Sequence, residues 1–69
     1  MKESLLAIVE QGIQYEDDFI QIYSDTIRNE GLMKRFGAHA ADAHTLLTTM
    51  IAESRGHRED LDALKEKMA

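Results

Sequence analysis

The chain has 69 residues, a formal net charge of −5 at pH 7 and no cysteine. A chain of this length forms one small domain, whose core rarely contributes more than about 3 to 5 kcal/mol without disulfides, a metal or self-association. The missing cysteines exclude disulfides and thiolate metal sites, and the negative charge disfavours nucleic acid as a partner.

The first predicted element is a helix over about residues 2–28. Its apolar residues follow one face of a helix at intervals close to a heptad repeat. They are Leu5, Val9, Ile13, Ile20, Tyr23 and Ile27. The skipped heptad position is Glu16, which lies within about 20° of Val9 around the helix at 100° per residue. The sequence thus predicts a carboxylate in the middle of the apolar face.

The segment Asn29-Glu30-Gly31 predicts the end of this helix, because glycine tolerates the left-handed conformation that terminates helices. A second helix is expected over about residues 32–54, up to a second break at Ser54-Arg55-Gly56. Its predicted inner face consists of Phe36, Ala40, Ala43, Leu47, Met50 and Ile51. Residues 57–69 are expected to form a short amphipathic helix or a tail.

A three-residue connection makes the two long helices antiparallel neighbours, so residues 1–55 are expected to form an all-α helical hairpin. Each helix would then leave much of its apolar face exposed. Pairing two hairpins into a four-helix bundle removes that exposure, and we therefore expect a homodimer or a larger assembly. The alternative is a monomer in which the segment after Gly56 folds over the groove.

A metal site is one interpretation of Glu16. With a turn near residue 30, residues whose numbers sum to about 61 lie at the same level, which places Glu16 next to His44. In a twofold dimer, two copies of each residue would meet in the core. Carboxylates and imidazoles that project inward from facing helices bind iron or manganese in such bundles. His39, on the opposite margin of the same helix, is a second-rank ligand candidate.

Two segments of the chain carry a resemblance to a known family. They are Tyr15-Glu16-Asp17-Asp18-Phe19 with Tyr23, and Phe36 through His44 followed by Leu46-Leu47. With them, residues 5–51 resemble one half of a ferritin-like or rubrerythrin-like bundle, in which one helix provides a core glutamate and the next a Glu-x-x-His motif. The resemblance implies a ferritin-like dimer with an iron or manganese site. The chain departs from the motif at Ala41, where a carboxylate would be needed for His44.

Two functions remain open on this evidence. In the first, the chain is a homo-oligomerisation or protein-interaction module without catalysis, and Glu16 is a buried polar residue that sets the register of the helices. In the second, a reduced Glu/His site at the dimer core binds a metal. Catalysis is the least supported function, because the bridging carboxylate is missing and no nucleophile stands at a motif spacing.

The longest apolar run, Leu5 to Val9, is too short to span a membrane and is followed by Glu10. We expect a cytoplasmic protein that contacts neither membrane nor nucleic acid. Its partner is expected to be a second copy of itself or another helical protein.

Overall fold

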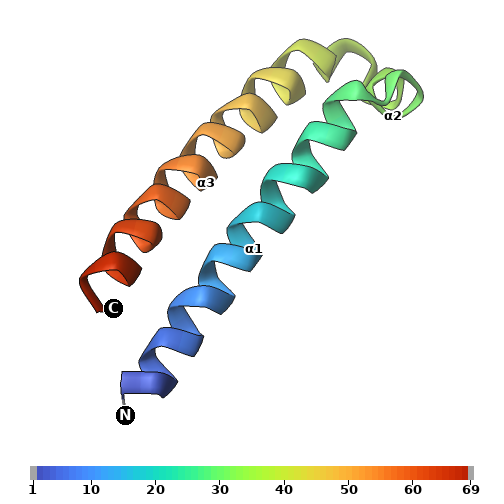
Figure 1. The fold of residues 1–69 in the computed structure, drawn as a ribbon. Helices are drawn as coiled ribbons and strands as arrows, with labels where there is room; N and C mark the ends of the chain where they lie inside the picture. The colour runs from blue at the N-terminus through green and yellow to red at the C-terminus, as the bar shows by residue number, and fades with distance from the viewer. Residues whose placement is uncertain (1, 69) are drawn as a thin grey trace.

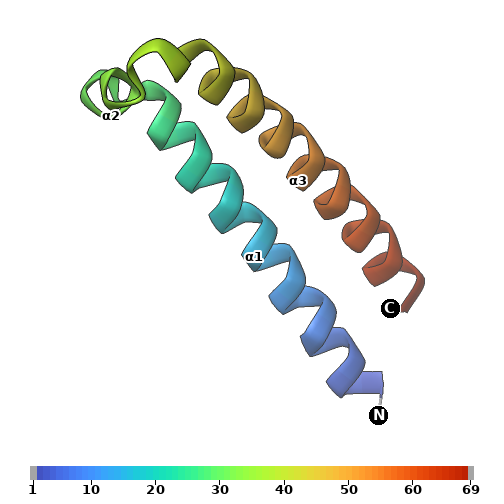
Figure 2. The same ribbon diagram turned by 180° about the vertical axis from the view of Figure 1, so that it is seen from behind.

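The computed structural model describes residues 2–68, and nearly all of them lie in helices. Helix α1 spans Lys2–Arg28, the short helix α2 spans Glu30–Arg35, a 3₁₀ turn η1 spans Gly37–His39, and α3 spans Ala40–Met68. Figures 1 and 2 show α1 and α3 side by side in opposite directions, with α2 at the tip and both termini at the other end. The molecule measures 50 × 15 × 14 Å. The all-α fold expected from the sequence is confirmed.

The tip is longer than the three-residue turn that was expected. Asn29 has an extended backbone (φ −86°, ψ 95°), and its side-chain oxygen accepts a hydrogen bond from the N–H of Leu32 at 3.1 Å. Asn29 therefore begins α2 as its N-cap, and Gly31 lies inside that helix. The left-handed residue is Gly37, with φ +57°, a conformation that glycine adopts without steric cost. The prediction that the connection between the two long helices ends at Gly31 is therefore wrong.

The predicted break at Ser54-Arg55-Gly56 is also wrong, because α3 continues through Gly56 to Met68. A glycine inside a helix costs only about 1 kcal/mol, which packing against a neighbour offsets. Leu61 packs on Gly12 of α1, where an added Cβ would lie 3.2 Å from Leu61 Cδ1. The predicted helices over residues 32–54 and 57–69 are thus one helix beginning at Ala40. The predicted segments are residues 1–55 and 57–69, and their outer ends, Met1 and Ala69, lie outside the residues that the structure describes.

The core is the seam between α1 and α3. Within residues 3–68, Val9 is the one buried apolar side chain, at 8% exposure, and Ser54 of α3 is the one buried polar side chain, at 7%. The other seam residues are half-buried: Leu6, Ile13, Glu16, Ile20, Tyr23 and Ile27 of α1, with Ala43, Leu47, Met50, Ile51 and Leu61 of α3. Leu5, expected in this row, is 52% exposed, and Phe36 is 42% exposed at the tip. Leu6 takes the predicted place of Leu5 because it continues the heptad spacing of the seam.

Two glycine variants are expected to change stability in opposite directions. Gly37→Ala should lower the free energy of unfolding by about 1 to 2 kcal/mol, because an L-residue is strained at φ +57°. Gly56→Ala should raise it by about 1 kcal/mol, because alanine favours a helix and the added Cβ meets no atom within 4 Å. Urea denaturation at one protein concentration measures both. A loss of stability in Gly56→Ala would contradict a continuous α3.

Candidate functional site

Glu16 forms a polar contact inside the apolar seam. Its side chain is 17% exposed, and its Oε1 lies 3.3 Å from Nδ1 of His57, whose side chain is 63% exposed. The second carboxylate oxygen, Oε2, is buried and has no hydrogen-bond partner among the described residues. A buried acceptor without a partner costs about 1 to 3 kcal/mol. The single hairpin therefore leaves half of this carboxylate unsatisfied.

The predicted pairing of Glu16 with His44 is wrong. Glu16 contacts His57, Gly12 contacts Leu61, and Glu10 contacts Lys65. The numbers of facing residues therefore sum to 73 or 75 in these contacts, against the predicted sum of about 61. The difference arises because α2 and η1 lengthen the connection. His44 lies thirteen residues before His57 in α3, or about 20 Å along the helix axis.

Neither histidine proposed as a ligand from the sequence is brought to Glu16. His39 ends η1 at the tip, His44 lies in the second turn of α3, and both are exposed. Within residues 2–68 of one chain, no three His, Asp or Glu side chains gather in a way that could hold a metal ion. Any metal site at Glu16 would need ligands from a second copy.

The contact of His57 with Glu16 was not predicted, because the expected break at Gly56 separates residues 57–69 from the second helix. A signal for it was present in the spacing of the second half of the chain. The series Ala43, Leu47, Met50, Ser54, His57, Leu61 alternates steps of four and three residues, without interruption at Gly56. A heptad repeat that continues across a glycine favours one helix, and it places His57 on the seam.

One face of the hairpin carries the ion pairs. Arg58 donates to Asp17 at 2.5 Å and to Asp62 at 2.8 Å, and Lys65 Nζ lies 3.5 Å from Glu10. The pKa of the Arg58 guanidinium is raised above its ordinary value, first by its hydrogen bond to Asp17 and then by the charges of Asp17 and Asp62. Each of these exposed pairs contributes little to stability. We call this side the polar face.

The opposite face is apolar. We define the apolar face by the large, exposed hydrophobic residues of the two long helices: Leu5, Ile8, Tyr15, Phe19, Ile22, Leu46 and Leu64. At 100° per residue, those of α1 lie about 100° to one side of the seam, whereas Glu10 and Asp17 lie about 80° to the other side. Leu46 and Leu64 lie on the matching side of α3, away from Asp62. Within residues 2–68, no helix is both long and apolar enough to cross a bilayer.

The elongated hairpin exposes more surface than a compact monomer of its mass. The accessible surface is 5296 Å² for a mass of 7.8 kDa. A compact monomer of that mass is expected to expose about 4400 Å². The excess of about 900 Å² is close to the roughly 800 Å² that each partner buries in a standard protein interface.

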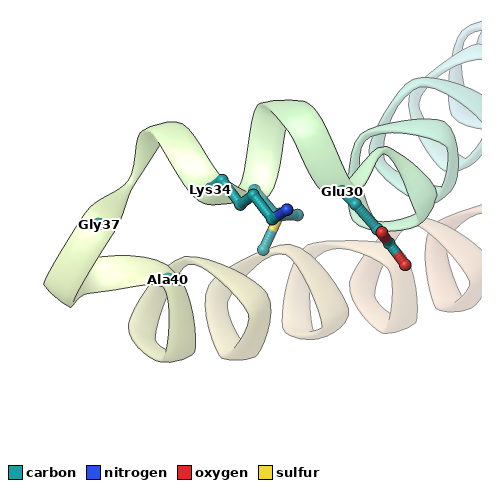
Figure 3. Close-up of a pocket in the computed structure, with 5 residues that line it drawn as sticks. Glu30, Lys34, Gly37 and Ala40 are labelled. Atoms are coloured by element: carbon teal, nitrogen blue, oxygen red, sulfur yellow. The ribbon is translucent and has the colours of Figure 1, made fainter.

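A shallow hollow of about 380 Å³ lies at the tip, remote from Glu16. It is lined by Glu30, Met33, Lys34, Gly37 and Ala40. Figure 3 shows it between α2 and the start of α3, with Glu30 and Lys34 at its edge. Its walls are mostly apolar, and it contains no nucleophile paired with a base.

Comparisons with protein-family profiles, with curated proteins and with solved structures found no match for this chain.

Proposed function

We propose that this chain is a self-association module, in which two helical hairpins pair through their apolar faces into a four-helix bundle. The exposure of that face is the observation that carries the proposal. Ile8 is 64% exposed, Ile22 56% and Tyr15 53%, although all three belong to a regular apolar row on one helix. Contiguous apolar patches of this kind mark interaction surfaces.

The energetics of the single hairpin support the same conclusion. Within residues 3–68 no large side chain is fully buried, and the seam provides one contact layer between two helices. Such a layer offsets little of the conformational entropy lost on folding. A second copy would cover the apolar face and add two more long helices to the core. Stability and pairing are therefore expected to be coupled.

Sedimentation equilibrium of the full chain across a wide concentration range tests the proposal. We expect a species of twice the 7.8 kDa chain mass, and a midpoint of thermal unfolding that rises with protein concentration. A helical chain that stays monomeric throughout, with a midpoint independent of concentration, would exclude self-association.

One observation favours a second candidate function, the binding of iron or manganese at the pairing interface. The buried Oε2 of Glu16 lacks a partner, and the neighbouring imidazole of His57 is a metal-ligand type. One chain supplies these two groups, and a second copy would supply two more. These residues would hold the ion, and an ion that completes the coordination of Glu16 would stabilise the paired state. This candidate requires both Glu16 and His57 for metal affinity, a requirement that the first candidate does not make.

A further inference from the structure

The exposed apolar row of α1 is complementary to itself when two copies are placed in opposite directions. The row continues through Gly12, so that its members follow steps of three and four residues: Leu5, Ile8, Gly12, Tyr15, Phe19 and Ile22. In a second copy that runs in the opposite direction, the first residue of the row faces the last residue of the other copy, and the two central residues face each other. Leu5 then faces Ile22, Ile8 faces Phe19, and Gly12 faces Tyr15. The residue numbers of every pair sum to 27, so one register satisfies the whole row.

The central pair joins a large side chain to a glycine. Tyr15 is 53% exposed and projects a large ring from α1. Gly12 has no side chain, and it lies one turn away on the same face. In the antiparallel register, the ring of the partner's Tyr15 would lie over the Gly12 backbone and the Leu61 side chain that packs on it, and the same contact occurs twice about the axis. A twofold interface has this property, because residue i of one copy contacts residue j of the other and the reverse.

Charges on α3 disfavour the other twofold arrangement. If the apolar row of α1 lay over α3 of the partner, it would cover Glu53 and Asp60, two exposed carboxylates on the same side of α3 as Leu46 and Leu64. Burying carboxylates against apolar side chains is costly. Placing α1 on α1 instead sets these acidic residues opposite α3 of the partner, outside the apolar row of α1.

The antiparallel register also fits the charges that would meet along α3. Because Gly12 is level with Leu61, the centre of the row lies near residue 60 of α3. Glu53 would then lie level with Lys67 of the partner subunit, which is an attractive pair. Asp60 would approach the partner's Asp60, a contact between like charges that costs about 1 kcal/mol or less at an exposed position.

We propose that a second copy of this chain covers the apolar row of α1 with its own α1 in the antiparallel direction, and that the twofold axis passes between Gly12 and Tyr15. This arrangement rests on the proposed self-association. In this arrangement Tyr15 and Gly12 set the register, and α3 of one copy lies beside α3 of the other.

Disulfide cross-linking of the full chain tests this register, and the absence of native cysteine makes the experiment unambiguous. The double variant Ile8→Cys/Phe19→Cys is expected to form a covalent dimer under mild oxidation. Each single variant should remain uncrosslinked, because equal positions of the two copies would lie about 16 Å apart along the axis, beyond disulfide reach. Thr48→Cys, on the polar face, measures the background from random collisions.

The outcomes separate the arrangement from the proposed function. A covalent dimer in the double variant alone supports the antiparallel register. Cross-linking of either single variant above the Thr48→Cys background would overturn it. So would a covalent dimer of Phe19→Cys/Glu53→Cys with none for Ile8→Cys/Phe19→Cys, which would place α1 over α3 of the partner. If the wild-type protein sediments as a dimer in either of these cases, only the proposed register is wrong and the proposed self-association stands. A wild-type protein that is monomeric would contradict both proposals.

Discussion

Phe19→Asp is expected to weaken pairing by at least a thousandfold and to leave a largely unfolded monomer at concentrations where the wild type is paired. Phe19 is 43% exposed in the single hairpin and lies in the apolar row of α1. Losing its burial removes about 2 to 3 kcal/mol for each chain, and each dimer contains two copies. Their sum corresponds to a dissociation constant raised by roughly three to four orders of magnitude. Burying the new carboxylates adds to this effect.

Sedimentation equilibrium and circular dichroism measure this loss. Thr48→Asp is the matched control, because it adds the same charge at an exposed position on the polar face and should pair like the wild type. Phe19 also stacks on Tyr23 within the chain, with ring centroids 6.2 Å apart. Ile8→Asp therefore serves as a second variant with no aromatic contact to lose. Pairing in both variants within tenfold of the wild type would exclude the apolar face as the interface.

Glu16→Leu is expected to raise the free energy of unfolding by about 1 to 2 kcal/mol. The substitution removes a buried carboxylate oxygen that has no partner and adds apolar surface to the seam. His57→Leu should act in the opposite direction and lower stability by about 1 to 3 kcal/mol, because both oxygens of Glu16 then lack a partner. Urea denaturation at equal protein concentration measures both. A strong loss of stability in Glu16→Leu would show that the carboxylate makes a favourable contact absent from the single hairpin.

Such a contact would favour the metal-binding candidate, and an anaerobic calorimetric titration of chelator-stripped protein with Fe(II) identifies it. Saturable binding that is lost in both Glu16→Leu and His57→Leu would establish a site at this pair. His44→Leu is the matched control, because it removes the ligand predicted from the sequence and should leave the binding unchanged. Wild-type protein that binds no Fe(II) or Mn(II) would leave Glu16 with a structural role alone.

Periodicity along the chain was sufficient to predict the local features. The heptad spacing of Val9, Ile13, Ile20, Tyr23 and Ile27 predicted one long helix and the face that it buries, because side chains at these intervals share a side of any helix. The same spacing predicted that Glu16 stands inside the seam. These properties depend on helix geometry alone, so they hold whatever α1 packs against.

The partner of Glu16 depended on the tertiary structure. Gly31, Gly37 and Gly56 are each able to end a helix, and local propensity does not distinguish among them. Contacts between residues that are distant in sequence decide which of these glycines ends a helix. Continuing α3 through Gly56 brings Leu61 onto Gly12 and covers the first half of α1, which a helix ending at residue 54 would leave exposed. That gain in apolar burial exceeds the cost of one glycine in a helix, and the resulting register replaces His44 with His57 beside Glu16.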